Sequence, residues 1–493
     1  MSRSQTIRAG APAPPPPWLR DAETRCRLAE AKRCVEWLLA DRGLRQALRA
    51  DPGRSAALAA QRGLACDPLE LAPLWRAEAW RGYRQNGAGA WPALALWLDW
   101  AVWLQTRRDG QRRAADPGPD RPELSAWRAR QMARNRFELG RHEQALTYPV
   151  FAYELSRGCS VGCRFCAFAA PRLSGVYAPT PANLRRWREV IAAGAEICGP
   201  NAAASGFLYW ASEPADNPGY LDFLAEFRSL TGALPPTTTA AADRDRDWTQ
   251  SLLELYAAQS DPGLRFSVLS LDMLARLHRA FSAEELLWAQ CLAQNPEAVA
   301  PKSPAGRARA ARRRPRREAD GPAAGLMAAD PDSTTTACLA GFLVNMVEGS
   351  VRLVSPCRPS ARWPMGYRVH AEGGFGDAGQ YRDFLLRAVA GRMPPHPPAE
   401  RPLRLNPLVN VAQDGDRIGL ASDCHALSLG PADPALGLIA GLAAQGRWRP
   451  AEAVERAVAA GAGYLSAWAA IERLAELGAL DDDPAPPYAE AAP

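Results

Sequence analysis

Lysine and long apolar runs are what this chain of 493 residues mostly lacks. Its lysines are Lys32 and Lys302, so almost all of its positive charge comes from arginine, and the net charge is a mild +6. In a chain also rich in alanine and proline, the excess of arginine over lysine indicates compositional bias and gives no reason to expect nucleic-acid binding. The most apolar stretch, residues 91–104, is too short to span a bilayer and contains Asp99, so we expect a buried helix and no membrane partner.

The N-terminal segment has no apolar core of the kind that an export signal needs. Residues 1–20 carry a proline-rich run instead, and we expect them to form a disordered tail. The eleven cysteines show no framework spacing, and disulfide frameworks are typical of small secreted domains. The sequence therefore predicts a cytoplasmic protein with reduced cysteines.

The pattern of expected elements changes near residue 146. Residues 21–145 have apolar residues at helical spacing and predict a helical N-terminal domain. Strand-like and helical segments then alternate, with strands expected at 205–210 and 264–270 and helices at 181–195, 220–230, 248–259 and 283–294. Strands that alternate with helices imply parallel βα units. The fold class is therefore predicted to be α/β, with a partial TIM-like (β/α)6 barrel over residues 146–345.

The rest of the chain is predicted to have four parts. Residues 297–333 are an arginine-rich insertion, and its densest run, 307–317, suits either a solvated loop or a docking surface for an acidic peptide. A strand-rich C-terminal extension follows over 346–430. Three short helices, expected at 435–445, 451–460 and 464–477, and a wing strand predict a winged-helix-like segment over 431–482 that binds a peptide rather than DNA, because its last helix has few basic residues. Residues 483–493 are expected to be a disordered tail.

Three cysteines in one short stretch carry the strongest chemical signal. Cys159, Cys163 and Cys166 are spaced C-x3-C-x2-C, and a compact loop of this kind can direct three thiolates at one iron–sulfur cluster. Three thiolates fill three corners of a four-iron cube and leave the fourth iron for a ligand that is not protein. Zinc is the alternative, but zinc sites more often pair two C-x2-C units or add histidines; this chain has no second pair, and its five histidines are scattered.

The spacing resembles the signature of the radical S-adenosylmethionine (SAM) enzymes, in which SAM binds the open iron of a [4Fe-4S] cluster. Phe165 stands directly before the third cysteine, as in that signature, and is expected to pack near the adenine. The segment around Glu213 matches a Gly-Gly-Glu-Pro-like motif, with Ala211 and Ser212 in place of the glycines, so Glu213 is implied as the acceptor for the SAM amino group. Ser267, on a later strand, could reach the SAM ribose or carboxylate. An ordinary structural role stays open for Glu213 and Ser267.

Further blocks look like the proteusin-type amino acid epimerases, radical SAM enzymes that mature ribosomally made peptides (RiPPs). The resemblance implies an isomerase that converts L-residues of a precursor peptide, with its leader and core, to D-residues. The 5′-deoxyadenosyl radical would remove hydrogen from Cα, a thiol would return hydrogen from the opposite face, and an external one-electron reductant would restore the thiol. The similarity covers roughly residues 148–373, and the matching blocks are residues 156–163, 209–218, 265–271, 342–348 and 353–357.

Such a hydrogen return needs a cysteine outside the cluster, because an S–H bond is close in strength to the Cα–H bond being made. Cys357 ends a predicted strand after Pro356, at an expected barrel-mouth position, and matches the hydrogen-donor cysteine that the resemblance implies. Packing is the alternative role for a buried cysteine. The other cysteines are dispersed, with Cys338 among small apolar residues, so we expect a single cluster.

Three other functions remain open at this level. A radical SAM enzyme could crosslink or C-methylate a peptide, although neither auxiliary-cluster cysteines nor a cobalamin domain is evident in the sequence. A protein of another class could carry a peptide without catalysis and keep the cluster as a structural element. A winged-helix DNA-binding sensor would require salt-dependent DNA affinity.

Overall fold

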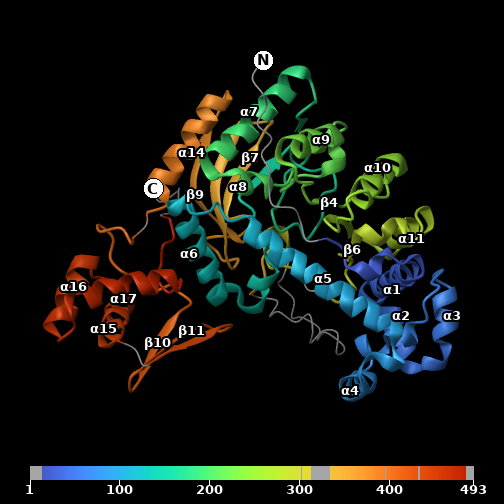
Figure 1. Cartoon of the computed structure of the whole chain (residues 1–493), viewed down its shortest axis with the longest axis horizontal. Coiled ribbons are helices and arrows are strands. Elements are labelled where there is room, and N and C mark those ends of the chain that lie inside the picture. Colours follow the sequence, from blue (N-terminus) through green and yellow to red (C-terminus); the bar gives the residue numbers. More distant parts are fainter. Residues whose placement is uncertain (1–13, 301, 312–332, 395, 431–432, 485–493) are drawn as a thin grey trace.

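The computed structural model describes residues 14–300, 302–311, 333–394, 396–430 and 433–484. Its N-terminal part is helical, as predicted, and α5, the longest helix among these residues, runs across the molecule (Figure 1). The helices of this part are α1 (Ala22–Ala40), α2 (Arg42–Ala50), α3 (Ser55–Ala60), α4 (Ala77–Asn86), α5 (Pro92–Ala114) and α6 (Pro122–Leu139).

Two small sheets stand at the centre of the chain. The first has the order β1-β7-β8-β9, with β1 and β7 parallel and the other neighbours antiparallel. The second has the order β4-β5-β6 and is all parallel. Their strands are β1 (Phe151–Glu154), β4 (Thr237–Thr239), β5 (Leu264–Val268), β6 (Ala289–Ala293), β7 (Gly341–Asn345), β8 (Ser350–Pro356) and β9 (Tyr367–Gly374).

Helices cover one face of these strands and bury the main core. Phe151 and Tyr153 of β1 pack there, and the Tyr153 ring meets Trp187 edge-on at a centroid distance of 4.9 Å. α7 and α14 lie side by side against the first sheet (Figure 1). The helices of this layer and its connections are α7 (Pro181–Cys198), α8 (Pro200–Ala204), α9 (Tyr220–Thr231), α10 (Arg246–Ala257), α11 (Leu271–Ala280), α12 (Gly306–Ala311) and α14 (Ala378–Arg392).

The opposite face of the first sheet packs a separate apolar group, which we call the loop-side cluster. Side chains on a strand alternate between its two faces, so residues next to the core residues of β1, β7 and β8 point to this side. Phe168 packs against the cluster and stacks on Trp210, with ring centroids 4.3 Å apart. Because Phe168 lies two residues after Cys166, the cluster joins the sheet to the cysteine stretch. Its buried members are Ala152, Phe207, Trp210, Ala337, Leu339, Leu343, Val354 and Tyr367.

Helices and parallel strands alternate as predicted, but one helix prediction is wrong. Residues 283–294, expected to be helical, form a 3₁₀ turn (Glu285–Trp288) and then strand β6. The strand expected at 205–210 contributes one parallel bridge, from Phe207 to Ala152 of β1. β8 and β9 continue the first sheet in antiparallel order, and the partial TIM-like (β/α)6 barrel stays a prediction.

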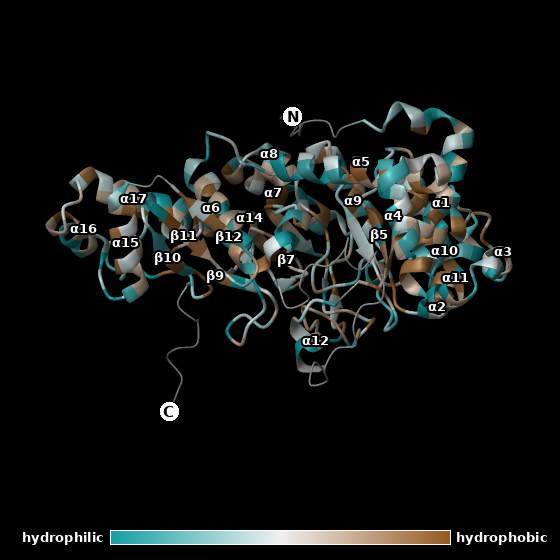
Figure 2. Cartoon of the chain, turned by 90° about the horizontal axis from the view of Figure 1, so that it is seen from below, coloured by the Kyte–Doolittle hydropathy of each residue, from teal (hydrophilic) through white to brown (hydrophobic). Residues whose placement is uncertain are grey.

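The C-terminal unit has a core of its own, in which a three-stranded antiparallel sheet packs with three helices and with Phe137 of α6. Figure 2 shows this unit at one end of the molecule and α3 at the other. The predicted wing strand is reduced to one antiparallel bridge between Leu405 and Leu480. The three predicted helices are confirmed as α15 (Pro434–Gln445), α16 (Pro450–Ala459) and α17 (Tyr464–Glu476), after strands β10 (Asn410–Asp414), β11 (Arg417–Ala421) and β12 (Ala426–Leu429).

Both predicted tails are shorter than expected. Residues Pro17–Arg20 form a 3₁₀ turn with Leu19 buried, and the Asp483 side chain is buried in ion pairs. The remaining parts of the tails and of the arginine-rich insertion, residues 1–13, 312–332 and 485–493, lie outside the described residues. Among the helices of the described chain, none combines the length and the apolar character that a membrane span requires.

Candidate functional site

The three cysteines lie on a loop that leaves β1 through a short hairpin. β2 (Ser156–Arg157) pairs antiparallel with β3 (Gly175–Val176) at the base of this loop. Gly158 has φ +83°, and a Cβ at this position would collide with the carbonyl group of Arg172. Only glycine therefore lets the two sides of the loop approach so closely.

Backbone hydrogen bonds make the loop compact and bring the thiols together. Cys159 N–H donates to Pro171 O at 3.0 Å, and Cys166 N–H donates to Cys163 O at 3.2 Å. All three cysteine side chains are half-buried. Burial, together with the nearby Cys159 and Cys166 thiols, raises the pKa of Cys163 to about 11. Metal ligation deprotonates a thiol outright, so these close, half-buried thiols are a donor set that could hold the expected [4Fe-4S] cluster.

Arg307 clamps this loop from outside. Its backbone N–H donates to Cys166 O at 2.9 Å, its Nη1 donates to Cys163 O at 3.0 Å, and its Nη2 donates to Ala170 O. The guanidinium thus bonds the loop through carbonyl oxygens. Arg307 is the first residue of the arginine run 307–317. That run was expected to be a solvated loop or a peptide-docking surface, but Arg307 contacts the cysteine loop instead. Residues 312–317 lie outside the described part.

Lys302 places a second cation beside the loop. Its Nζ lies 4.8 Å from the centroid of the Phe165 ring, over the aromatic residue that was expected to pack near the adenine. The same Nζ donates to Gln294 Oε1 at 3.0 Å. Burial lowers the pKa of Lys302 to about 8, and the nearby Cys163 opposes that change. The Phe165 ring of the cysteine loop therefore faces a cation.

Glu213 is 3% exposed at the start of a 3₁₀ turn, Pro214–Asp216. Its Oε1 accepts from Thr239 Oγ1 and from Ala215 N–H (3.2 Å), and its Oε2 accepts from Ala240 N–H (2.8 Å). Burial raises its pKa, while these three donors lower it. A carboxylate has about four acceptor positions, so these three donors leave one position of Glu213 unfilled while its side chain ties the turn to β4. Its expected role in binding SAM stays a prediction.

The turn that begins after Glu213 also contacts the cysteine loop. Ser160 N–H donates to Asp216 Oδ2 at 2.8 Å, and Arg244 Nη1 donates to Ser160 Oγ at 2.8 Å. The structure therefore brings together two of the segments that the sequence selected, the cysteine stretch and the segment around Glu213.

Ser267 lies on β5 and is half-buried. Leu264, Phe266 and Val268 of this strand are buried in the main core, so Ser267 and Arg265 point to the opposite face. In the described part of the chain, no hydrogen bond joins Ser267 to the cysteine loop. Its expected role in binding SAM stays a prediction.

Glu154 is a buried acid that sequence reasoning missed. It ends β1, just before the cysteine loop, where its Oε1 accepts from Ala211 N–H (2.8 Å) and its Oε2 accepts from Asn345 Nδ2 (3.1 Å). Burial raises the pKa of Glu154 to about 7, although both donors lower it. An acidic residue at the end of an apolar strand, Phe-Ala-Tyr-Glu, was the signal that could have found it.

Cys357 follows β8 and is fully buried. Its N–H donates to Gly366 O at 2.9 Å. Burial raises the pKa of its thiol to about 12; among the nearby charges, Arg368 lowers this pKa and Glu138 and Asp483 raise it. Among the described residues, no hydrogen bond joins Cys357 to the cysteine loop, and its charged neighbours belong to α6, β9 and the C-terminal segment.

Those neighbours form what we call the buried ion-pair network: Arg134, Glu138, Arg368 and Asp483. Arg368 Nη2 lies 2.6 Å from Glu138 Oε1, and Arg134 Nη2 lies 2.7 Å from Asp483 Oδ1. Arg368 also pairs with Asp483, and Trp363 Nε1 donates to Asp483 Oδ2 at 3.0 Å. All four charged side chains are at most 9% exposed. The network joins α6, β9 and the C-terminal segment beside Cys357.

Cys338 is a thiol outside the cysteine loop that packs in one cluster with Phe168, two residues after Cys166. It is half-buried and packs against the loop-side cluster, to which Phe168 also belongs. Burial raises its pKa to about 11, and the nearby Arg265 lowers it. The sequence placed Cys338 among small apolar residues, and nothing local indicated that it shares a cluster with Phe168.

Glu36, His278 and Cys291 form a second group with metal-ligand chemistry, with their ligand atoms within 4.8 Å of one another. Lys32 Nζ lies 2.6 Å from Glu36 Oε1, and Trp37 Nε1 donates to His278 Nδ1 at 3.1 Å. A buried ammonium opposes a cation, and the ring nitrogen is already paired. The group is therefore a polar connection between α1, α11 and β6.

Comparison with known proteins gives one informative match. No family model matches this chain, and no solved structure matches it. A protein of Sinorhizobium fredii strain NGR234, named "Uncharacterized protein y4wI", is 34% identical over 470 residues, which covers 94% of this chain and 89% of that protein. At this identity and coverage, the chain belongs to the same family as y4wI of Sinorhizobium fredii.

Proposed function

We propose that this protein is a radical SAM peptide epimerase, an isomerase that converts L-residues of a ribosomally made precursor peptide to D-residues. The observation that carries the proposal is the loop with Cys159, Cys163 and Cys166, in which the Cys159 and Cys166 thiols lie close enough to Cys163 to raise its pKa. The resemblance of the surrounding blocks to proteusin-type epimerases narrows the reaction. All eleven cysteines are free thiols, which supports a cytoplasmic location.

In this proposal the three cysteines hold three irons of a [4Fe-4S] cluster. The cluster and SAM, when bound and supplied with an electron by an external reductant, provide the 5′-deoxyadenosyl radical that takes hydrogen from a peptide Cα. Arg307 keeps the loop closed, Glu213 and Ser267 bind SAM, and Phe165 borders the adenine. Each of these roles can be tested by substitution without reference to the final product.

The chain must also present an S–H group to the planar carbon radical. Burial raises the pKa of Cys357 to about 12 and that of Cys338 to about 11, so both thiols keep their hydrogen at neutral pH. Cys357 matches the donor that the resemblance implies, and we assign it that role. Cys338 is the rival, because it packs in the loop-side cluster with Phe168.

Co-expression with a candidate precursor peptide in deuterated water tests the reaction. A thiol hydrogen exchanges with solvent, so each inverted centre should appear as a D-residue carrying one deuterium, detected by mass spectrometry and chiral analysis of the hydrolysate. Loss of hydrogen or gain of carbon without a D-residue would identify a crosslinking or methylating enzyme instead. Peptide binding with an intact cluster and no turnover would support a carrier.

Single alanine variants identify the donor in the same assay. Cys357→Ala should still cleave SAM and form no D-residue, whereas Cys338→Ala should retain epimerisation. The reverse pattern would assign the role to Cys338 and leave the proposed reaction intact. Full epimerisation by both variants would exclude either thiol as the essential donor.

A further inference from the structure

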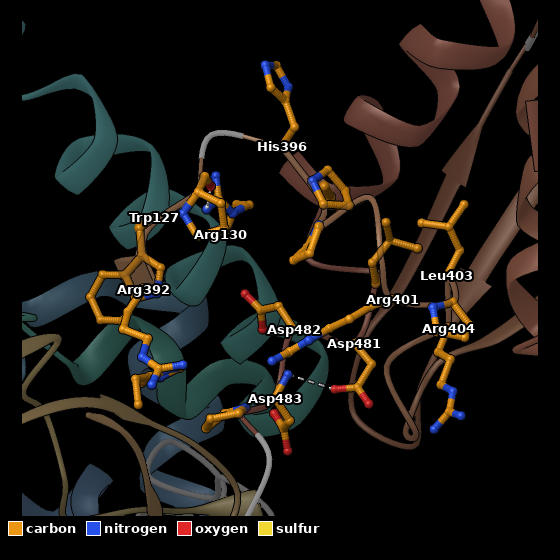
Figure 3. A pocket seen from close by; sticks show the side chains of 18 of the residues that line it. Trp127, Arg130, Arg392, His396, Arg401, Leu403, Arg404, Asp481, Asp482 and Asp483 are labelled. Carbon is orange, nitrogen blue, oxygen red and sulfur yellow. Dashed lines mark hydrogen bonds between the residues drawn. The ribbon is translucent and has the colours of Figure 1, made fainter. Parts of the chain in front are cut away.

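A cavity of about 840 Å³ lies between α6, the end of α14 and the C-terminal unit, apart from the cysteine loop. Its walls are rich in arginine and also contain Trp127, Leu403 and Leu480. Figure 3 shows Trp127, Arg130 and Arg392 on one side, Leu403 and Arg404 on the other, and three aspartates between them. The arginines that line it are Arg130, Arg134, Arg362, Arg392, Arg401 and Arg404.

The three aspartates show that carboxylates fit this cavity. Asp483 pairs with Arg134 through Oδ1 (2.7 Å), and its Oδ2 accepts from Trp363 Nε1 (3.0 Å). Asp482 Oδ2 accepts from Gln131 Nε2 at 2.8 Å. Asp481 Oδ1 accepts from the Asp483 N–H at 3.0 Å, the bond drawn in Figure 3. An acidic segment of this chain thus already lines part of the cavity.

The cavity lining as a whole retains a positive excess. Six arginines line the cavity, against the three aspartates and Glu400. The aspartates form ion pairs with Arg134, whose side chain is buried, whereas Arg392 and Arg401 are exposed. Charge of one sign in a concave site attracts the opposite charge. The site therefore has room and charge for further carboxylates beside those that the chain supplies.

We infer that this cavity docks an acidic segment of a peptide partner, whose carboxylates lie opposite Arg392 and Arg401 and alongside Asp481–Asp483. A polyphosphate backbone fits less well, because the row of aspartates would repel its dense charge. A peptide places apolar side chains between its carboxylates, and Trp127, Leu403 and Leu480 provide surface for them. That the partner is the precursor peptide rests on the proposed function. That the docked segment is acidic rests on the cavity alone.

Fluorescence anisotropy with a labelled peptide of alternating glutamate and alanine tests this docking on the full-length protein. Two exposed arginines interact only modestly with carboxylates, and reversing their charge adds repulsion, so Arg392→Glu with Arg401→Glu should weaken binding about tenfold. Arg387→Glu is the matched control, because Arg387 is an exposed arginine of α14 that does not line the cavity. A lysine–alanine peptide should not bind.

Asp481→Asn provides an opposite change, because removing one resident carboxylate should tighten binding of the acidic probe. Unchanged affinity in the double arginine variant, equal weakening by Arg387→Glu, or absence of probe binding to the wild type would each overturn the inference. Circular dichroism checks that the variants are folded. The assay involves no turnover, so cavity-dependent binding in a protein that makes no D-residues would sustain the docking site and reject the epimerase.

Discussion

The cysteine loop and the surroundings of Cys357 place thiol groups in two different environments. The loop is held through backbone carbonyls, by Arg307 among others, and its thiols stay half-buried. Cys357 is fully buried beside an ion-pair network that satisfies its own charges. The first arrangement leaves sulfur atoms partly accessible to an added ligand, and the second encloses the sulfur completely. The comparison teaches that packing around a thiol decides how far an added ligand can reach its sulfur.

The largest effect is expected from the loop itself. Cys163→Ala should leave the anaerobically reconstituted protein with almost no bound iron and no SAM cleavage, because two thiolates cannot hold a cluster that needs three. Cys26→Ala, at an exposed cysteine of α1, is the matched control and should bind iron normally. Iron and sulfide analysis measures both. Normal iron content in Cys163→Ala would break the comparison, since the loop would then not be the ligand set.

The next effect concerns the network beside Cys357. Arg368→Leu removes one of the two buried arginines that pair with Glu138 and Asp483 and leaves Arg134 alone against both acids, so the free energy of unfolding should fall by about 3–5 kcal/mol. Arg382→Leu is the control, because its pair with Glu196 is exposed and worth about 0–1 kcal/mol. Urea unfolding measures both changes. Equal losses would show that the network beside Cys357 contributes no more than a surface pair.

A third effect lies at Glu154, which stands at the base of the loop but is buried like Cys357. Its folded-state pKa of about 7 exceeds the ordinary value of 4.5, so the folded state binds this proton more tightly than the unfolded state. The stability it provides is therefore complete below pH 4.5 and declines as the pH rises to about 7, by up to about 3 kcal/mol.

Glu154→Gln cannot ionise and should lack this decline. Urea unfolding at about pH 4.5 and pH 7.5 gives the difference for each protein, and subtracting the variant removes the titration of all other groups. Parallel pH dependence in the two proteins would show that Glu154 titrates normally and that the base of the loop is more hydrated than the structure indicates.

The smallest effect is expected at Arg307, which holds the cysteine loop. Arg307→Ala removes two side-chain hydrogen bonds to loop carbonyls and should speed loss of iron to a chelator about tenfold. Arg307→Lys keeps the charge without the two-pronged donation and should restore only part of the retention. Arg164→Ala, at an exposed arginine of the same loop, should have no effect. Full rescue by lysine would assign the effect to charge alone.

Local signals predicted the helices whose ends are marked by a glycine. α15 ends before Gly446 and α17 begins after Gly463, and both helices were expected within a residue of their bounds. Residues 283–294 were assigned wrongly, because a short apolar run suits a buried helix and a parallel strand equally well. Pairing with β5, through residues that are more than twenty positions away, selects the strand.

The candidate site divides in the same way. The C-x3-C-x2-C spacing required no knowledge of the fold, since one loop carries all three ligands. The clamp by Arg307 connects positions 144 apart, and the contacts of Arg368 with Glu138 connect positions 230 apart. No local pattern contains such pairs, so sequence reasoning missed them along with Glu154 and Cys338.

The sequence by itself determined that three cysteines share one loop, because neighbours along a chain cannot separate. Only the tertiary structure decided which cations border that loop, that Cys357 adjoins an ion-pair network, and that Asp481–Asp483 fill part of an arginine-lined cavity. The physical reason is that burial and electrostatic environment depend on groups that are distant in sequence, and folding alone brings these groups together.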